Sequence, residues 1–471
     1  MGVIYLQQLR EYFASFRVQI GLFVVLLFFL LNGVLASLRI EQMREDDALL
    51  RANIEQRYER VQTVASGAST RFRVANEPTG TEFMSEGGFN WFWGSVWMTA
   101  ETGVFMGFYY ARDINVWMDR FESLDWTLIV RLVLSFLCIV LAYDGIAGEA
   151  ERGTLRLVLA YPISRIQVLL AKFSAQLTVL GTAFVLGSLI SLVILSFGAD
   201  LALTVELLGK YLLYGAAVGI YLSLFLLLSL GVSALMRSSV SALVLLTLTW
   251  AVVNIILPQS SYLAAVRTVE VPEEMRSEAG SYMSQVRWSL YNEGRGPRSP
   301  ETARADDYAV ERRYARLMED AEKEGYRLGQ VWLDRKVERY EVARTVNLLS
   351  PAYAFQYAVE ALLGTGLPKR QHFLDQAFEY RETLRSFLRE RDAGDGDSPH
   401  LLFHSEFMSQ EPLDGDQMPR FVEQPLSPAD GVAFSVVPFV VLLVETLASF
   451  LFALWAVNRL DVTGYAMAED S

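Results

Sequence analysis

The sequence predicts an all-α membrane protein with six transmembrane helices, an N-terminal interfacial helix and a mostly helical extracytoplasmic domain. Of its 471 residues, 52% are hydrophobic and 12% are aromatic, and the mean hydropathy is +0.26, which is unusual for a soluble protein. Six apolar stretches approach the roughly 20 residues that an α-helix needs to cross a bilayer core of about 30 Å. A long charged stretch between the last two of them has helical spacing and few glycines or prolines.

Residues 1–38 are predicted to form an interfacial helix followed by the first span. Residues 5–16 carry large apolar side chains along one side, which suits a helix that lies on the membrane surface. These side chains are Leu6, Leu9, Tyr12, Phe13 and Phe16. A simple extension of the span is the alternative. The span covers residues 18–38, and no small-residue cleavage site follows it closely, so we do not expect a cleaved signal peptide.

Five further spans are predicted, at residues 128–143, 168–197, 207–235, 240–257 and 432–457. The first of these five is short unless Trp126 anchors it. With six spans, the basic residues of the short connections fall on one side of the membrane, and they include Arg17, Arg152, Lys172, Arg237 and Arg459. Basic residues in short loops mark the cytoplasmic side. We therefore expect a multi-pass protein of the cell (inner) membrane with both termini in the cytoplasm.

Residues 39–125 are predicted to lie on the extracytoplasmic side. They open with a charged amphipathic helix over residues 40–66, and a loop follows at residues 76–80. Residues 89–98 include three tryptophans within seven positions, a cluster that most often anchors a chain among lipid headgroups. Contact with a substrate is the alternative interpretation.

A second exterior segment, residues 258–430, is predicted to be a small and predominantly helical domain. One or two long helices are expected over residues 304–346, and further helices at 352–363 and 372–391, followed by an acidic loop at residues 392–399. In the first of these helices, dense charge of both signs alternates with apolar residues, which indicates a solvated face rather than a site. The predicted divisions of the chain are 1–38, 39–125, 126–257, 258–430 and 431–471, the last holding the sixth span and a cytoplasmic tail.

The sequence lacks the patterns that enzyme or nucleic-acid chemistry requires. The net charge of −13 argues against a nucleic-acid partner. Cys138 is the only cysteine, and the three histidines are scattered rather than spaced as metal ligands. Gly209-Lys210 is followed by tyrosine, so no phosphate-binding G-x-x-x-x-G-K-[ST] loop exists. We expect no catalytic, cofactor-binding or metal-binding residues, and therefore no enzyme activity, in this chain.

The most informative segment joins the second and third predicted spans, at residues 144–167. A charged, glycine-rich segment cannot lie in hydrocarbon, so it protrudes into water. Gly145 and Gly148 allow the chain to leave the span at a sharp angle, and glutamates near a helix start suit the positive end of the helix dipole. Thr154 is expected to cap the following turn, where residues 155–159 have an apolar face. This pattern predicts a short helix along the membrane that offers charge and an apolar knob to a partner.

This loop resembles the cytoplasmic loop of ABC-2 type ABC-transporter permeases, which reads roughly D-x-I-x-G-E-x-E-x-G-T-L, then P-x-x-R and a lysine. The resemblance assigns ATPase coupling to Asp144, Gly145, Gly148, Glu149, Glu151, Arg152, Gly153, Thr154, Leu155 and Pro162. Ala150 stands where the family often has arginine, which removes one possible salt bridge. The match is good over residues 120–175 and looser over the six-span layout. The Ser-Pro at 350–351 and the Gly-Thr-Gly at 364–366 add to it.

The resemblance implies a transmembrane permease subunit of an ATP-driven transporter, most often an exporter. A separate cytoplasmic ATPase would dock on residues 144–165 and would bind ATP and Mg²⁺, and a second permease copy or a paralogue would complete twelve spans. Two other functions stay open. The same coupling would drive the exterior domain against an extracytoplasmic protein without moving a solute, or the chain would be a sensor or scaffold without an ATPase. For the loop alone, the alternative is a generic juxtamembrane turn.

Two ionisable residues fall inside predicted spans. Glu445 lies near the centre of the sixth span, where a carboxylate costs about 3 kcal/mol and usually faces a partner or a cavity. A functional role and a structural role are both open for it. Arg131 lies a few residues inside the second span, and we expect its long side chain to extend to the outer surface.

Overall fold

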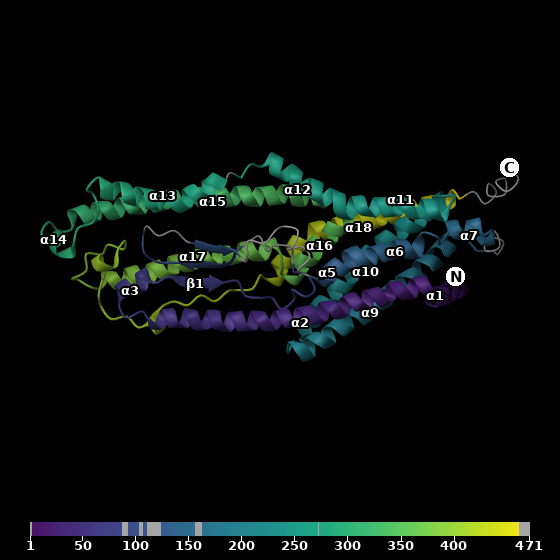
Figure 1. Cartoon of the computed structure of the whole chain (residues 1–471), viewed down its shortest axis with the longest axis horizontal. Helices are drawn as coiled ribbons and strands as arrows, with labels where there is room; N and C mark the ends of the chain where they lie inside the picture. The colour runs from purple at the N-terminus through teal and green to yellow at the C-terminus, as the bar shows by residue number, and fades with distance from the viewer. Residues whose placement is uncertain are drawn as a thin grey trace.

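The computed structural model describes residues 2–86, 93–102, 107–110, 124–155, 163–271 and 273–460. Within these ranges, six long apolar helices form the part that is suited to span a membrane (Figure 1). They are α2 (Phe16–Glu59), the run from α5 to α7 (Trp126–Glu151), α9 (Arg165–Gly198), α10 (Val205–Leu235), the run from α11 to α12 (Ser239–Thr268) and α18 (Pro428–Asn458). Each contains one predicted span. The prediction of an all-α membrane protein with six spans is confirmed.

Two of the spans contain a π-helical turn. The second consists of α5 (Trp126–Leu128), the π-helical η1 (Ile129–Leu134), α6 (Ser135–Ala142) and, after a turn, α7 (Ala147–Glu151). The fifth consists of α11 (Ser239–Ala251), the π-helical η2 (Val252–Ile256) and α12 (Leu257–Thr268). Tyr221 of α10 touches both π-helical turns, because its hydroxyl donates to the Arg131 carbonyl at 3.1 Å and lies 3.5 Å from Asn254 Oδ1.

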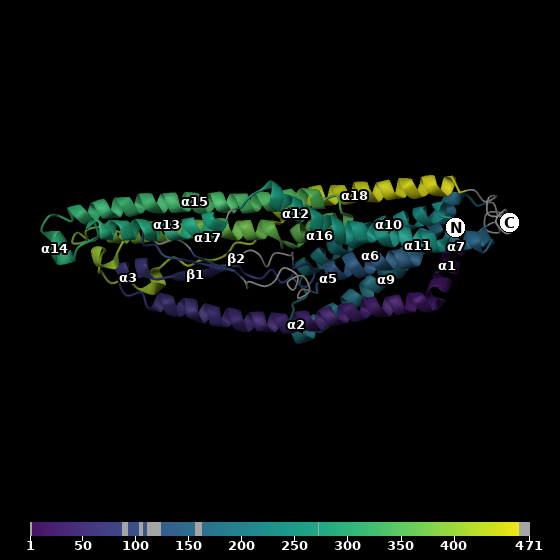
Figure 2. The ribbon, with the colours of Figure 1, turned by 45° about the horizontal axis from the view of Figure 1, so that its top comes forward.

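The two ends of the molecule are built differently (Figures 1 and 2). One end, called here the loop end, holds α1 (Gly2–Ala14), α7 and the C-terminal end of α18. The other end carries an elongated distal domain, which comprises α3, the strands, α13–α17 and the outer part of α2. Ser15 has extended backbone and separates α1 from α2, and the Tyr5 hydroxyl of α1 lies 3.1 Å from Thr178 Oγ1 of α9. α1 is thus a separate helix, and the alternative that it merely extends the first span is wrong.

The first span continues into the distal domain without a break. α2 has 44 residues and joins the predicted span at 18–38 to the predicted amphipathic helix that follows it. It ends at Glu59, earlier than the predicted residue 66. Thr63 accounts for the difference, because its side chain and that of Ser66 exchange hydrogen bonds with each other's backbone and start the new helix α3 (Val64–Ser69).

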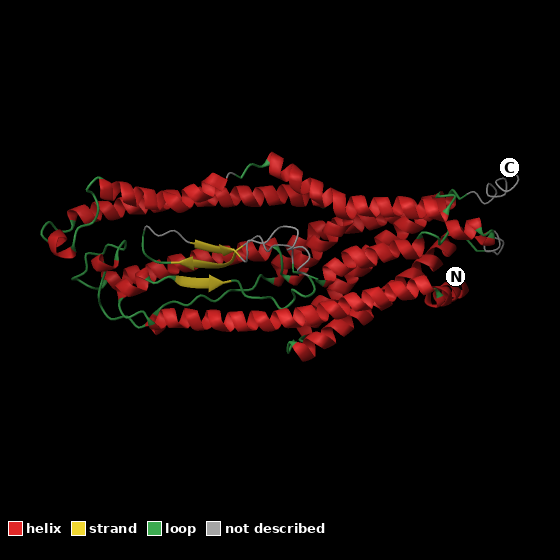
Figure 3. Ribbon diagram, viewed as in Figure 1, coloured by secondary structure: helices red, strands yellow, loops and turns green. Residues whose placement is uncertain are grey.

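A small antiparallel sheet, which was not predicted from the sequence, lies in the distal domain (Figure 3). Its order is β1 (Phe72–Ala75), β2 (Trp93–Met98) and β3 (Gly107–Tyr110), with Val74 paired to Val96 and Val96 to Phe108. Residues 93–98 of the tryptophan-rich segment therefore form the central strand, and Arg71 lies 4.8 Å above the Trp97 ring. The strand was not expected, whereas the predicted headgroup anchor stays a prediction, and residues 89–92 lie outside the described ranges.

The remaining distal elements are helical. They are α13 (Glu273–Asn292), α14 (Pro300–Arg304), α15 (Ala309–Asn347), α16 (Pro351–Leu363), α17 (Leu367–Ala393) and the 3-10 turns η3 (Ser405–Phe407) and η4 (Gly415–Gln417). α13 and α15 pack side by side and project farthest from the bundle (Figures 1 and 2). α16 returns to the bundle and packs against α18 and α10.

The two predicted exterior segments share one hydrophobic core. Phe72 and Val96 from the first segment are buried with Phe373 and Leu384 from the second. Thr63 also forms a β-bridge with Pro412. The distal domain is therefore assembled from both segments, and movement of either one is resisted by the other.

A buried cluster of three charges lies between α15 and α17. Glu322 accepts from Arg381 Nη2 at 2.5 Å and from Arg385 Nη2 at 2.6 Å, and all three side chains are less than a tenth exposed. The same arginines donate through Nε to the carbonyls of Thr99 and Ala100, each at 3.0 Å. The cluster thus connects two helices to the end of the sheet.

The stability of the protein should depend on pH because of Glu101. This residue directly follows Ala100, whose carbonyl accepts a hydrogen bond from the cluster. Burial raises the pKa of its carboxyl group from 4.5 to about 7. The native state therefore holds the proton more tightly than the unfolded state, so stability should fall as the pH rises from 4.5 to 7. For a partly exposed carboxyl we expect a loss of about 1–3 kcal/mol. Thermal unfolding of the detergent-solubilised chain at pH 5 and pH 8 measures it, and Glu101→Gln should make the two melting temperatures more similar.

Candidate coupling loop

Glycines determine the path of the loop between α6 and α9. After α6 the chain turns at residues 143–146 and forms the five-residue α7. A side chain at Gly145 would come within 3.2 Å of the Leu230 side chain, so the loop packs directly on α10. Gly153 has a φ of +72°, in the left-handed region that favours glycine. α7 is therefore followed at once by a sharp turn.

Asp144 connects the start of the loop to α2. Its Oδ2 accepts a hydrogen bond from Arg17 Nη2 at 3.0 Å. Arg17 also donates to the Tyr143 hydroxyl, and its guanidinium lies 5.8 Å from the centroid of that ring. An exposed ion pair alone contributes at most about 1 kcal/mol, but the three contacts together hold the turn against the first span.

Ser233 of α10, a residue that was not identified from the sequence, holds the turn from the opposite side. Its buried hydroxyl accepts from the backbone nitrogens of Ile146 and Ala147 at 3.1 and 3.0 Å, and donates to the Tyr143 carbonyl at 2.7 Å. The first backbone N–H groups of a helix lack intrahelical partners, so this hydroxyl satisfies the start of α7. A small serine in an apolar helix gives no periodic signal that would reveal this contact in advance.

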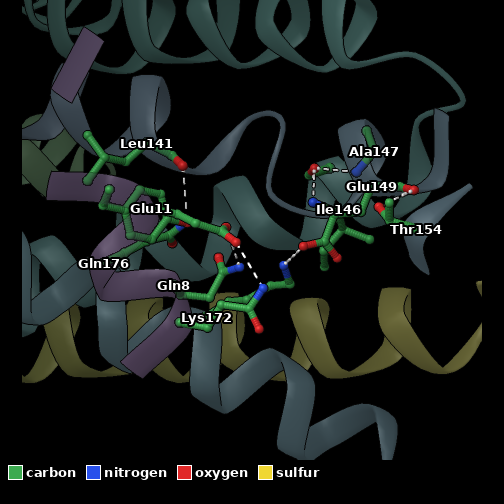
Figure 4. A network of polar contacts seen from close by, with 12 residues as sticks. Gln8, Glu11, Leu141, Ile146, Ala147, Glu149, Thr154, Lys172 and Gln176 are labelled. Carbon is green, nitrogen blue, oxygen red and sulfur yellow. Dashed lines mark hydrogen bonds and ion pairs between the residues drawn. The ribbon is translucent and has the colours of Figure 1, made fainter. Parts of the chain in front are cut away.

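Glu149 and Lys172 form the most buried ion pair of the loop (Figure 4). Lys172 Nζ lies 2.5 Å from Glu149 Oε1, and Lys172 is 1% exposed. A buried ammonium is tolerated only with a close partner, so this pair fixes α7 to α9. One turn further along α9, Gln176 donates to the Leu141 carbonyl at 3.0 Å and to the Tyr12 hydroxyl of α1 at 2.7 Å.

Glu151 connects the end of α7 to α11. Its two carboxylate oxygens accept from the backbone N and the hydroxyl of Ser239 at 2.9 and 2.8 Å. It thus caps the start of α11 rather than the start of α7, where it was predicted to act. Thr154 donates to the Glu149 carbonyl at 3.2 Å, so it closes the end of α7 instead of capping the following turn. Leu155 is buried in the chain's own core and cannot be the exposed knob.

Three consecutive exposed residues follow Glu151 and are called here the loop tip: Arg152, Gly153 and Thr154. The carboxylates of Asp144, Glu149 and Glu151 are bound within the chain. Among the described residues, no ion pair is recorded for Arg152. Among the described residues of the loop, Arg152 is therefore an exposed charge without an ion-pair partner in the chain.

The exit of the loop is attached to the last span. Ser164 and Gln167 form a capping box that begins α9. Arg165 Nη1 donates to the carbonyls of Val457, Asn458 and Leu460 at 3.2, 2.9 and 2.9 Å. A cation at a helix C-terminus also complements the dipole, so Arg165 holds α18 at the loop end. Pro162 and the rest of residues 156–162 lie outside the described ranges.

The two intramembrane ionisable residues lie away from the loop. Glu445 is half-buried on α18, and its Oε2 has no hydrogen-bond partner among the described residues. It precedes the carbonyl of Val457 by 12 residues, or about 18 Å along the helix. Arg131 is half-buried beneath α16 and does not extend to the outer surface as predicted. Gln356 of α16 accepts from its Nη1, and the Tyr353 ring lies 4.5 Å from its guanidinium.

The contacts of the loop join four membrane helices. Within the described ranges, no three His, Cys, Asp or Glu side chains converge to hold a metal ion. The loop instead holds α2, α9, α10 and α11 together through the contacts of Asp144, Glu149, Glu151 and Ser233.

Comparison with known proteins identifies the family. Residues 9–461 match the family described as "ABC-2 family transporter protein". The chain is an ABC-2 transporter permease. Its relatives include the "Probable ABC transporter permease protein NosY" of Stutzerimonas stutzeri, 31% identical over 94 residues, and that of Pseudomonas aeruginosa, 41% identical over 61 residues. These alignments cover 19% and 13% of the permease, and about a third and a fifth of the relatives.

Proposed function

We propose that this permease is the transmembrane subunit of an ATP-driven ABC-2 exporter, and that a separate ATPase binds it at residues 144–165. Membership of the family implies an ATPase in the transporter, and that ATPase would bind the ATP and Mg²⁺. The observation that carries the proposal is that one short loop is bonded to four membrane helices while its tip is left exposed.

The contacts of the loop give the direction in which force would pass. An ATPase that closes on ATP would press on Arg152 and its neighbours. Because Glu149 is paired with buried Lys172, α7 cannot yield without moving α9. The Asp144 and Glu151 contacts would move α2 and α11 in the same step, and Arg165 would carry the displacement to α18. As these helices move, the side of the membrane from which a solute can enter the bundle would change.

The same proposal places the protein in the cell (inner) membrane with the loop end in the cytoplasm. Both termini would then be cytoplasmic, since α1 and the end of α18 lie beside α7 (Figure 1). The distal domain would be extracytoplasmic. A second copy of the permease, or a paralogue, would complete a twelve-span assembly.

A second function is favoured by the continuity of the spans with the distal domain. α2 and the run from α11 to α12 pass from the apolar bundle to the distal elements without a loop. Movement of the bundle would therefore act directly on an extracytoplasmic protein, with no solute crossing. Reconstitution with the ATPase distinguishes the two functions. ATP-dependent movement of a solute across the membrane supports export. ATP-dependent changes in the distances between residues of the distal domain, without solute movement, support force transmission.

Reversing the charge of the loop tip tests the docking site. Arg152→Glu should reduce copurification of the ATPase at least tenfold, because it inverts the charge that the exposed tip presents and removes none of the ion pairs that hold the loop. Arg10→Glu is the matched control, since Arg10 is an exposed arginine of α1 at the same end. Pull-down from mild detergent measures both variants. Equal ATPase recovery with Arg152→Glu and the unaltered chain would disprove docking at the tip.

A further inference from the structure

A cleft of about 330 Å³ lies where α2 leaves the apolar bundle. One wall is a single face of α2, because its lining residues recur three or four positions apart between Asn32 and Arg51. The opposite wall consists of residues from 77–86, together with Leu124, Asp125 and the turn after α9. The volume is within the range of small-ligand sites.

The inner end of the cleft is closed by a buried hydrogen-bond cluster. Asn32 Oδ1 accepts from Trp126 Nε1 at 2.9 Å and from Ser191 Oγ at 2.8 Å, which ties α2 to α5 and α9. Asn32 Nδ2 donates to the carbonyls of Phe83 and Leu124. These polar groups are occupied, so the floor presents Leu35, Ala36 and Phe83 as an apolar surface.

The outer end of the cleft carries charges of both signs. Arg39 pairs with Glu86 at 2.6 Å, and Arg51 pairs with Asp47 at 2.8 Å and Glu77 at 3.4 Å. The two Arg51 pairs are exposed, and exposed pairs are weak and can be exchanged for the charges of a ligand, whereas in the Arg39 pair only the guanidinium is exposed. Arg44 also lines the cleft, and no ion pair is recorded for it within the described ranges.

The cleft lies at the boundary between the apolar and the charged part of α2. Asn32 and Leu35 belong to the apolar part of α2, and the charged part begins at Arg39. Leu35 and the neighbouring Leu38 are 51% and 55% exposed, so the cleft is continuous with a helix face that is suited to contact with lipid. A ligand that enters from the bilayer meets apolar contacts first and charges at its headgroup.

We propose that this cleft binds a zwitterionic phospholipid of the leaflet nearest the distal domain. Its phosphate would lie at Arg39 and Arg44, its ammonium at the carboxylates of Asp47, Glu77 and Glu82, and the start of an acyl chain along Leu35. An anionic lipid lacks the ammonium group, so its negatively charged headgroup would face these carboxylates and be repelled by them. The site is independent of the export proposal, because occupancy requires neither ATP nor an ATPase.

Native mass spectrometry of the full-length, detergent-purified permease tests the proposal with added phosphatidylethanolamine or phosphatidylglycerol of identical acyl chains. We expect phosphatidylethanolamine to be retained at least fivefold more than phosphatidylglycerol. Arg44→Glu should abolish this preference without unfolding, since no internal ion pair of Arg44 is recorded in the described part of the chain. Arg60→Glu changes an exposed arginine that directly follows α2 and does not line the cleft, and it should preserve the preference.

A second variant separates loss of charge from loss of space. Met43→Trp adds an indole at an already exposed position of the lining and should displace the lipid with the charges unchanged. Equal retention of the two lipids would identify ordinary annular lipid and overturn the proposal. A preference that survives both Arg44→Glu and Met43→Trp would place the lipid elsewhere and would overturn it too.

Discussion

Replacing Lys172 by methionine is expected to reduce ATP hydrolysis that depends on the permease at least tenfold in a reconstituted complex with the ATPase. The substitution leaves Glu149 largely buried without its cation, and breaking a buried pair from one side costs about 3–5 kcal/mol. That cost exceeds the roughly 1.4 kcal/mol that corresponds to a tenfold change in an equilibrium. α7 should therefore leave its position on α9, and the ATPase would no longer move the bundle through it.

Two further variants make this result specific. Lys210→Met removes the cation that pairs with the exposed Glu206 on the same helix α10, and it should leave hydrolysis unchanged. The double variant Lys172→Met with Glu149→Leu removes both buried charges and should recover docking of α7, because no unpaired charge remains. Normal coupling in Lys172→Met alone would show that the ion pair does not transmit force.

Replacing Glu322 by alanine is expected to unfold the distal domain. The variant leaves Arg381 and Arg385 buried without the carboxylate that both contact, with an expected loss of about 3–5 kcal/mol, a large fraction of the stability of an ordinary domain. Limited proteolysis of the detergent-solubilised chain measures it, since cleavage between residues 273 and 420 should become rapid while the spans stay protected.

Glu319→Ala is the matched control for this experiment. Glu319 lies on the same helix, is half-exposed, and pairs only with exposed Lys323 at 3.4 Å among the described residues, so its removal should change stability by less than about 1 kcal/mol. Equal proteolysis rates for the two variants would show that the buried charges do not hold α15 to α17.

The spans could be predicted from the sequence because a long uninterrupted apolar run is a strong and local signal. The sheet could not be predicted in the same way. β1 and β3 are very short, and the pairing that places Phe72 opposite Met98 joins segments that a long connection separates in the chain. The position of Arg131 was also unpredictable, since its partner Gln356 on the covering helix α16 lies far away in the sequence.

In the loop, too, contacts between residues that are distant in the sequence could not be predicted. Its charged residues were identified from their types and spacing, but the partners of each were not. Glu151 binds Ser239, and the turn before α7 binds Ser233. Ser233 lies near the end of the fourth span, and Ser239 follows that span, so both are far from the loop in the sequence. Leu155 is apolar in either environment, so only tertiary contacts determine that it is buried instead of exposed.

The unbroken length of α2 has a consequence for the scale of movement. A straight helix of 44 residues measures about 66 Å, so each degree of tilt about one end displaces the other by about 1 Å. A rotation too small to open the bundle visibly would still sweep the far tip through a distance comparable to a side chain. Any small rearrangement at one end of α2 would therefore be amplified at its other end.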